Sequence, residues 1–273
     1  MPELPEVETV KETLKLRLIG KKIVDVHVYH DNIIEYPIVS EFKKQIINQR
    51  VNNIDRYGKW LIFELDDYYL LSHLRMEGKY FFRTSQEDLN KHEHVVFCLD
   101  DGTELRYMDV RKFGKMHLIV KGDIKTRGPL IDMGLEPWDN NLTVDYLKDK
   151  FSRKKLPIKS VLLDQSIIVG IGNIYANEIL YLSNINPLIS AMNLGDRELE
   201  MIIINTREVL ERAIKKGGTT IRSYTSVDGV HGLFQQELYV HGKENIPCKR
   251  CNTPIIKIKV GGRGTYYCSK CQK

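Results

Sequence analysis

The spacing of apolar residues predicts that the chain begins with an amphipathic helix. Pro5 suits the first turn of a helix, and the helical pattern ends near Gly20. Between them, apolar residues recur every three or four positions, at Val7, Val10, Leu14 and Leu18. The amino end of this helix carries a partial positive charge, so it favours nearby anions.

From residue 22 to about residue 121 the pattern changes to the alternation of strands. Apolar and polar residues alternate over 22–28, 60–65 and 94–99. Asp101-Gly102 separates two such runs, which is a strong signal for a β-hairpin. Several short antiparallel strands with few helices predict a β-sandwich.

The second half of the chain is predicted to be helical. Residues 135–141, around Pro137, have the composition of a linker, and helices are expected over 142–151, 158–163, 175–182 and 197–216. We therefore predict a first domain over 1–134, a helical domain over 142–238 and a third domain over 239–273. The whole is an α+β multidomain chain.

Composition limits the class of protein. A chain of 273 residues with 42% hydrophobic and 28% charged residues is ordinary for a globular protein. No apolar run is long enough to span a bilayer, and the amino end does not resemble a signal peptide. We expect a cytoplasmic protein that does not bind membranes.

The distribution of charge indicates a polyanionic partner. The net charge is only +5, but residues 239–273 contain eight Lys or Arg and a single acid, Glu244. That segment alone carries +7, which leaves −2 for the rest of the chain. A concentrated basic segment favours nucleic acid as the partner, although a solvated basic face is the common alternative.

Four of the five cysteines have the spacing of a structural zinc site. Cys248 and Cys251 form one CxxC pair, and Cys268 and Cys271 form another after 16 intervening residues. Four thiolates leave no coordination position for water, so one structural Zn²⁺ is expected and no organic cofactor. Two disulfides are the alternative, but nothing else indicates an oxidising compartment. The fifth, Cys98, is expected to be a small buried core residue.

The residues between the cysteine pairs predict a hairpin. They alternate around Gly261-Gly262-Arg263-Gly264, which places Arg263 at the expected tip. Such a basic hairpin beside a zinc site is suited to contact with nucleic acid.

The first residues offer unusual chemistry. Pro2 is a good substrate for removal of Met1, so the mature chain is expected to begin with a secondary amine. An amine with a pKa of roughly 7.7–8.0 is partly neutral near pH 7 and can form a Schiff base. Glu3 stands beside it and Glu6 one turn further on, which provides general-acid assistance. The alternative is a frayed terminus with no function.

Two glycine-rich segments have alternative interpretations. Residues 170–178 include Gly170, Gly172 and Asn173, and resemble a dinucleotide fingerprint only faintly because their flanks are helical. A tight helix–turn–helix junction that binds a phosphate is favoured, and a purely structural turn is the alternative. Residues 217–232 are rich in Gly, Ser and Thr and have the composition of a long loop, and loops of this length are usually either functional or disordered.

Taken together, these motifs resemble the bacterial formamidopyrimidine-DNA glycosylases, which are also 8-oxoguanine DNA glycosylase/AP lyases. The resemblance covers essentially the whole chain. It rests on the start Pro2-Glu3-Leu4-Pro5-Glu6, the segments around Lys59, Met76 and Arg111, the junction at Asn173, and the cysteine hairpin with Gly262-Arg263-Gly264-Thr265. It implies an N-terminal β-sandwich flanked by helices, a helix–two-turns–helix domain, a C-terminal β-hairpin zinc finger, and DNA between the two halves.

The resemblance also implies catalytic roles. Pro2 would attack C1′ of the damaged nucleotide, and Glu3 would assist base departure and opening of the sugar. Lys59 would donate a proton during β-elimination, and Arg263 during δ-elimination. The expected activity is therefore removal of oxidised purines from double-stranded DNA, followed by cleavage of the abasic strand.

Further residues match positions at which the family contacts DNA. His92, Arg111 and Lys155 match DNA-contacting positions, and Asn173 matches a phosphate-binding position. A monomer is expected, because two domains of one chain suffice to enclose DNA.

A trio of residues matches the side chains that the family inserts into the duplex. Met76 and Phe113 would fill the space left by the extruded base, and Arg111 would bond to the orphaned partner base, preferably cytosine. Taken alone, Met76 and Phe113 are more often core residues.

Other functions remain open at this point. The related endonuclease VIII branch favours oxidised pyrimidines, but its members usually have Gly where Leu4 stands and lack this trio. A non-catalytic zinc protein that binds damaged DNA is a further alternative. His241 stands where an aromatic Tyr is common, so a phosphate contact from this position is in doubt.

Overall fold

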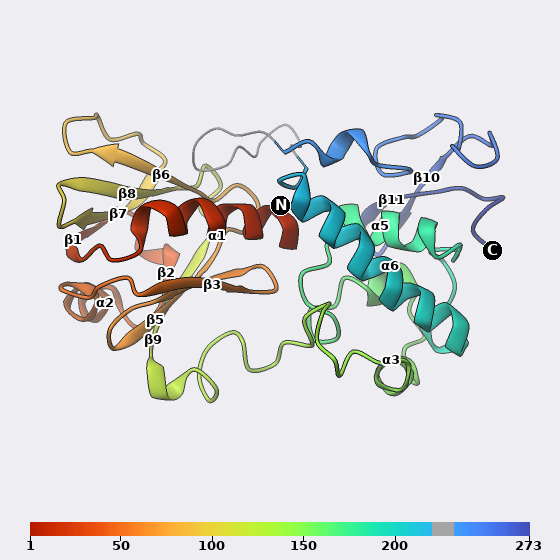
Figure 1. The fold of residues 1–273 in the computed structure, drawn as a ribbon, viewed down its shortest axis with the longest axis horizontal. Coiled ribbons are helices and arrows are strands. Elements are labelled where there is room, and N and C mark those ends of the chain that lie inside the picture. The colour runs from red at the N-terminus through yellow and green to blue at the C-terminus, as the bar shows by residue number, and fades with distance from the viewer. Residues whose placement is uncertain (220–231) are drawn as a thin grey trace. The chain divides into compact units, whose positions relative to one another are not determined.

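The computed structural model describes residues 1–219 and 232–273 (Figure 1). The chain folds into two units. The first holds Met1–Ile131 and the described ends of Gly217–Gly232, and the second holds Asp132–Lys216 and Leu233–Lys273. Among the described residues, no helix is both long and apolar enough to cross a bilayer.

The first unit begins with the predicted helix. Helix α1 spans Leu4–Leu18, with Glu3 as its extended N-cap and Pro5 in its first turn. Its apolar residues are buried, and it packs against β3 (Asn53–Tyr57) and β4 (Trp60–Glu64). The helix ends before Gly20, whose φ of +86° no longer follows the helix.

Two sheets form the predicted β-sandwich. One has the order β1-β7-β8-β6 and is antiparallel throughout; its strands are β1 (Ile23–Val28), β6 (Lys79–Thr84), β7 (Glu93–Leu99) and β8 (Thr103–Met108). The other has the order β2-β9-β5-β4-β3 and adds β2 (Ile34–Tyr36), β5 (Tyr68–His73) and β9 (Lys115–Val120). Buried apolar residues of both sheets form one core, and the expected turn at Asp101-Gly102 joins β7 to β8.

Three details of this unit differ from the sequence prediction. Helix α2 (Val39–Ile46) was not predicted, because it buries only Phe42 and Ile46 and its periodic signal is short. The pair β2–β9 is parallel. The expectation that Cys98 is a buried core residue is wrong: Cys98 is half-buried on the face of β7 opposite to Phe97 and Leu99, which belong to the core.

The second unit contains the predicted helices. They are α3 (Val144–Phe151), α4 (Ile158–Val161), α5 (Asn173–Leu182) and α6 (Asp196–Lys215). Thr143 caps α3 by accepting the N–H of Tyr146 at 3.2 Å, and α5 packs against α6. Four 3₁₀ turns complete the helical elements of the described residues, at Asp31–Ile33, Lys121–Asp123, Ala191–Asn193 and Phe234–Gln236.

A two-stranded hairpin of β10 (Ile256–Val260) and β11 (Arg263–Tyr267) follows, as predicted. Gly261 and Gly262 form its turn with φ of +55° and +76°, a conformation that glycine adopts without strain. Arg263 therefore lies one residue beyond the expected tip, as the first residue of β11 and opposite Val260.

Candidate functional site

The amino-terminal segment is buried and tied down. Pro2 and Glu3 are both buried, whereas Met1 is exposed. The Glu6 carboxylate accepts the N–H of Glu3 at 2.8 Å through one oxygen. Its other oxygen accepts the N–H of Thr219 at 2.7 Å and the Thr219 hydroxyl at 3.0 Å. Glu6, which the sequence offered beside Glu3 as a carboxyl group near the amine, thus joins the start of the chain to Thr219.

Glycines allow this close approach. Gly218 has a φ of +76°, and a Cβ there would lie 2.7 Å from Oε1 of Glu6 and 3.0 Å from its Cγ and Cδ. A Cβ on Gly232 would overlap the carbonyl oxygen of Gly218 and lie 2.7 Å from that of Gly217. The two described ends of the 217–232 segment therefore meet backbone to backbone. The rest of this predicted loop, residues 220–231, lies outside the described residues.

The terminal amine lies in a charged environment. Burial lowers the pKa of the Met1 amino group below its ordinary value, the carboxylates of Glu3 and Glu6 oppose this shift, and the ammonium of Lys59 adds to it. Lys59 is itself buried and follows Gly58 in the two-residue turn that joins β3 to β4. The structure thus gathers the predicted residues Pro2, Glu3 and Lys59 around the start of the chain, where an amine of lowered pKa is more often neutral.

His73 was missed by the sequence analysis and supports the neighbouring loop. Its ring packs edge-on against Trp60, with centroids 4.8 Å apart, and its Nδ1 accepts the N–H of Arg75 at 2.9 Å. Burial lowers the pKa of His73 to about 3, with help from the charges of Arg75 and Lys59. A neutral acceptor therefore holds the turn at Arg75, which has a φ of +51° and immediately precedes the half-buried Met76.

A second loop presents Arg111 and Phe113. The buried carboxylate of Asp109 accepts the backbone N–H groups of Arg111 at 3.0 Å, Phe113 at 2.9 Å and Gly114 at 2.8 Å. The guanidinium carbon of Arg111 lies 4.7 Å from the centre of the Phe113 ring, and Phe113 is 49% exposed. An exposed aromatic ring under an arginine is suited to stacking on a base.

Tyr107 joins the two loops. It is fully buried on β8, and a Cβ on either Gly78 or Gly114 would overlap its hydroxyl group. Gly78 lies two residues after Met76, and Gly114 directly follows Phe113. Both loops that carry the predicted trio therefore pack against the Tyr107 side chain. The spacing of these residues in the sequence does not reveal this shared contact.

In the second unit, the predicted Gly-Asn junction is a helix start. Gly172 is the N-cap of α5, and Nδ2 of Asn173 donates to the carbonyl of Gly264 at 3.1 Å. Gly264 is adjacent to Arg263, which is exposed. The junction and the hairpin, 91 residues apart in sequence, are thus joined directly. Among the described residues, Oδ1 of Asn173 is buried without a hydrogen-bond partner.

A buried lysine, also missed from the sequence, supports this junction. Lys159 donates to the carbonyl of Asn173 at 3.0 Å and to Oδ1 of Asn177 at 2.6 Å. Nδ2 of Asn177 lies 2.7 Å from Nδ1 of His241. Burial, with the charge of Lys159, lowers the pKa of His241 to about 4, so the ring is neutral near pH 7 and accepts from the amide.

The remaining predicted DNA contacts lie nearer the surface. Lys155 is exposed between α3 and α4, and His92 is half-buried just before β7. Neither is adjacent in sequence to the amino-terminal segment. Their roles remain predictions.

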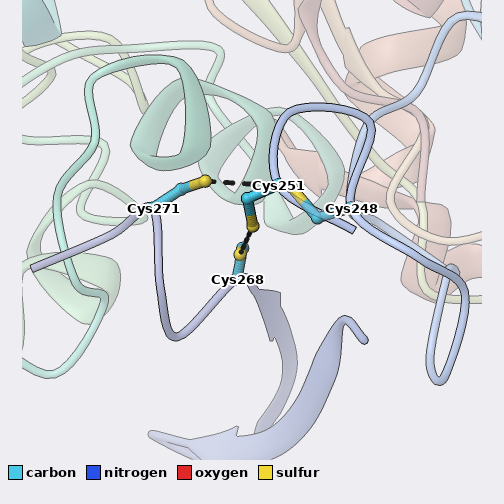
Figure 2. A group of neighbouring side chains, drawn as sticks. All are labelled: Cys248, Cys251, Cys268 and Cys271. Atoms are coloured by element: carbon cyan, nitrogen blue, oxygen red, sulfur yellow. Dashed lines mark hydrogen bonds between the residues drawn. The ribbon is translucent and has the colours of Figure 1, made fainter. Parts of the chain in front are cut away.

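The four predicted metal ligands come together (Figure 2). The four sulfur atoms lie within 4.8 Å of one another, with Cys248 and Cys271 3.9 Å apart and Cys251 and Cys268 3.4 Å apart. A tetrahedral Zn²⁺ with bonds of about 2.3 Å requires sulfurs about 3.8 Å apart. All four cysteines are free, so the alternative of two disulfides is wrong. They form a structural zinc site.

Family models match three parts of the chain. The formamidopyrimidine-DNA glycosylase N-terminal domain matches residues 1–116, the H2TH domain of the same enzymes matches 133–225, and a zinc finger found in FPG and IleRS matches 245–273. A formamidopyrimidine-DNA glycosylase of Oceanobacillus iheyensis is 48% identical over 273 residues, which is 100% of this chain and 98% of that protein. The chain belongs to the formamidopyrimidine-DNA glycosylase family.

Other family members agree along the full length. The formamidopyrimidine-DNA glycosylase of Bacillus subtilis is 45% identical, with 100% of this chain and 99% of that protein covered. Among solved structures, a point mutant of Lactococcus lactis Fpg, in complex with Fapy-dG containing DNA, matches with a TM-score of 0.93 and 37% identity, each chain being covered completely. Lactococcus lactis Fpg in complex with abasic-site DNA matches with a TM-score of 0.92 and 37% identity over 99% of each chain.

Proposed function

We propose that the chain is a bifunctional DNA glycosylase/AP lyase of base excision repair. It removes oxidised purines, such as 8-oxoguanine and formamidopyrimidines, from double-stranded DNA and then cleaves the strand. The observation that carries this proposal is the burial of Pro2 and Glu3 beside Lys59, within a chain that belongs to this family.

The chemistry starts at the amine of Pro2, which removal of Met1 exposes. Its lone pair attacks C1′, and the glycosidic bond breaks with its electrons leaving on the damaged base, which takes up a proton. Glu3 protonates the sugar ring oxygen as the ring opens, which gives a Schiff base between Pro2 and C1′. Burial lowers the pKa of the Met1 amino group in the intact chain. The Pro2 amine of the processed chain would lie in the same buried segment, so we expect burial to favour its neutral, nucleophilic form as well.

Strand cleavage follows from the Schiff base. Loss of a proton from C2′ expels the 3′ phosphate in β-elimination, and a second elimination expels the 5′ phosphate. We assign Lys59 as the proton donor of the first step and Arg263 as that of the second. Water then hydrolyses the remaining imine and regenerates the amine of Pro2.

The damaged base must leave the helix before this chemistry starts. Extrusion of a base costs a few kcal/mol, and side chains that fill the gap offset part of that cost. We assign Met76 and Phe113 to fill the gap and Arg111 to bond the orphaned base. The exposure of Phe113 beneath Arg111 supports this assignment.

Contacts to the DNA backbone complete the binding site. We assign His92, Lys155 and Asn173 to this task, and the positive charge of residues 239–273 adds a sequence-independent attraction. The zinc site holds the hairpin that carries Arg263. We place the enzyme in the cytoplasm, where bacterial DNA lies.

We retain the predicted domain division: a β-sandwich catalytic domain over 1–134, a linker over 135–141, a helical domain over 142–238 and a zinc finger over 239–273. The family models cover 1–116, 133–225 and 245–273, so they support the three parts and their order, while their limits differ from the predicted boundaries by up to 18 residues (116 against 134). Residues 142–216 and 233–238 of the helical domain share the second unit with the zinc finger, whereas the described ends of 217–232 belong to the first unit.

Cleavage of defined duplexes tests the function. A duplex with 8-oxoguanine opposite cytosine is expected to yield a one-nucleotide gap with phosphate at both ends, the product of β,δ-elimination. Pro2→Gly is expected to lose this activity. Cleavage by Pro2→Gly at the wild-type rate, or binding without any cleavage by a chain free of Met1, would contradict the proposal.

Oxidised pyrimidines are a second candidate substrate class. A solved structure of Lactococcus lactis Fpg contains an oxidised pyrimidine in its DNA, and its TM-score to this chain is 0.92. A thymine-glycol duplex compared with the 8-oxoguanine duplex decides between the classes. We expect faster cleavage of the purine lesion.

A further inference from the structure

A buried cation lies outside the site described above. Arg106, on β8, is 2% exposed, and it is flanked by the carboxylates of Glu93 and Glu104. Its Nε donates to Glu104 at 2.7 Å and its Nη1 to Glu93 at 3.0 Å. Burying a charged guanidinium costs free energy unless its N–H groups find partners.

The other N–H groups bind backbone. Nη1 also donates to the carbonyl of Asp88 at 3.1 Å, and Nη2 donates to the carbonyls of Thr84 at 3.1 Å and Glu87 at 2.8 Å. A guanidinium has five N–H groups, so these contacts together with Glu93 and Glu104 engage all of them. Arg106 therefore holds the segment that connects β6 to β7.

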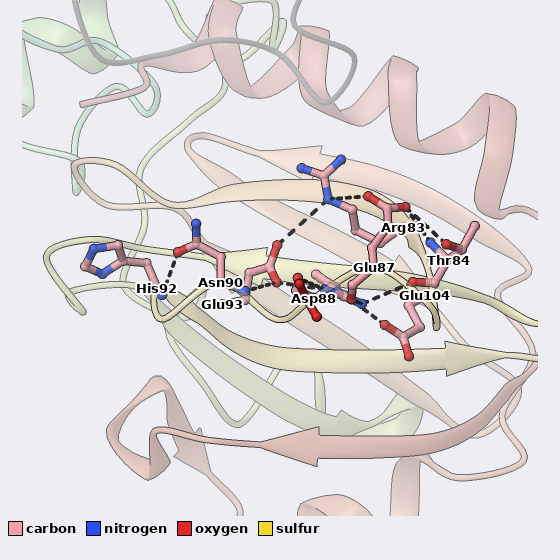
Figure 3. Close-up of polar contacts among 9 residues, drawn as sticks. Arg83, Thr84, Glu87, Asp88, Asn90, His92, Glu93 and Glu104 are labelled. Carbon is pink, nitrogen blue, oxygen red and sulfur yellow. Dashed lines mark hydrogen bonds and ion pairs between the residues drawn. The ribbon is translucent and has the colours of Figure 1, made fainter.

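The contacts continue from this cluster to His92 (Figure 3). The Glu93 oxygen bound to Arg106 also accepts the N–H of Asn90 at 3.0 Å. Oδ1 of Asn90 then accepts the N–H of His92 at 3.0 Å. The carbonyl of His92 accepts the N–H of Asp109 at 2.9 Å. Asp109 is the residue whose carboxylate shapes the Arg111–Phe113 loop. One hydrogen-bonded series thus runs from a buried cation to two predicted DNA-contacting elements.

Besides the bonds to Arg106, the contacts of this segment are local: the Glu87 carboxylate accepts the N–H of Thr84 at 2.9 Å, and the carbonyl of Asn90 accepts the N–H of Glu93 at 2.8 Å. Residues 84–91 are all exposed, so no buried apolar side chain anchors them. Within residues 1–219 and 232–273, the His92 side chain has no hydrogen-bond partner, so its ring nitrogens are available to a DNA phosphate. A contact by such a residue depends on how well its backbone is held before DNA arrives.

We propose that Arg106 is a positioning residue for DNA binding, and that it acts through Glu93 and Asn90 to hold His92 at a DNA phosphate. The inference rests on the proposed function, because it takes His92 as a DNA contact. It adds residues that no motif identified, since Arg106 lies at the middle of a strand and its partners lie up to 22 positions away.

A double-mutant cycle tests the proposal. Asn90→Ala removes one exposed side chain and only the last link of the series, so the fold is expected to survive. Affinity is measured for a duplex with a tetrahydrofuran abasic analogue, which the enzyme cannot process. Asn90→Ala is expected to weaken binding about three- to tenfold, the effect of one hydrogen bond. Gln86→Ala, at an exposed position of the same segment, is the matched control and is expected to bind as wild type.

The decisive comparison is made in a His92→Ala background. If Asn90 acts through His92, then Asn90→Ala adds less than about a twofold effect there. A full, additive loss would overturn the proposal, as would His92→Ala binding like the wild-type protein. Arg106→Lys keeps the positive charge but loses the five N–H donors of the guanidinium. Combined with His92→Ala, it is expected to show the same non-additive loss of affinity as Asn90→Ala. If Arg106→Lys does not fold, the test rests on the Asn90→Ala and His92→Ala cycle.

Borohydride trapping of the wild-type protein on an 8-oxoguanine duplex separates this inference from the proposed function. If the protein is trapped on DNA but the effects of Asn90→Ala and His92→Ala on affinity add, only the inference is refuted. If the protein is not trapped but these effects do not add, the enzymatic function is refuted and the positioning role of Arg106 is supported.

Discussion

Gly218→Ala tests whether the Glu6 carboxylate organises the catalytic end of the chain. An added Cβ would lie 2.7 Å from Oε1 of Glu6 and 3.0 Å from its Cγ and Cδ, well inside ordinary contact of 3.4–4 Å. Glu6 is buried and holds the N–H groups of Glu3 and Thr219, so it cannot move without losing hydrogen bonds. The substitution therefore acts directly on the segment that carries Pro2.

The structure sets the expected magnitude. An alanine at a φ of +76° costs about 1 kcal/mol in backbone strain. Loss of two or three hydrogen bonds to Glu6 adds about 1 kcal/mol each, so Gly218→Ala is expected to destabilise the protein by about 3 kcal/mol. Gly20→Ala is the matched control, because Gly20 has a φ of +86° and its added Cβ would meet nothing within 4 Å. This control is expected to cost only the backbone strain of about 1 kcal/mol.

Two assays report the difference. Urea unfolding measures the free energy of unfolding of each variant, and borohydride trapping on a lesion duplex measures formation of the Schiff base. Gly218→Ala is expected to slow trapping about tenfold or more, because Glu6 no longer holds Glu3, while Gly20→Ala traps at the wild-type rate. Equal effects of the two substitutions in both assays would show that contact with Glu6 is irrelevant.

Tyr107, His73 and Cys248 give three further tests. Gly114→Ala would overlap the Tyr107 hydroxyl and is expected to weaken binding of lesion DNA about tenfold in a fluorescence anisotropy titration, whereas Gly122→Ala, with open space around it, binds normally. Equal affinities would refute the joint role of Tyr107. His73 has its pKa lowered to about 3, so its neutral ring stabilises the fold fully above the unfolded pKa of about 6.5 and progressively less as the pH falls toward 3. The free energy of unfolding in urea is expected to fall by about 2–3 kcal/mol from roughly pH 6.5 to roughly pH 4.5 because of this group, and an undiminished loss in His73→Asn would contradict that assignment. Cys248→Ser is expected to release zinc and weaken DNA binding; unchanged zinc content by elemental analysis would remove the assignment.

Local signals carried most of the correct predictions. The CxxC pairs, the Pro5 helix start and the Asp101-Gly102 hairpin each lie within a short stretch of sequence, and each is found where it was expected. Cys98 was assigned wrongly because strand alternation does not reveal which face of a strand carries the core.

The supporting residues could not be found this way. Lys159 meets Asn177 and, through it, His241, which is 82 positions along the chain. Tyr107 meets Gly78 and Gly114 only once the strands have paired. A buried polar residue has no periodic signature, because its role depends on partners that the fold brings together.

The identity of the nucleophile is the claim on which the account depends, and peptide mapping of the trapped protein–DNA complex tests it most directly. After borohydride treatment with an 8-oxoguanine:cytosine duplex and digestion of protein and DNA, tandem mass spectrometry locates the residue that carries the reduced sugar. We predict a single adduct on the α-nitrogen of Pro2, in a chain that has lost Met1. An adduct on Lys59 or another lysine, or no adduct on a chain that begins with Pro2, would contradict the account.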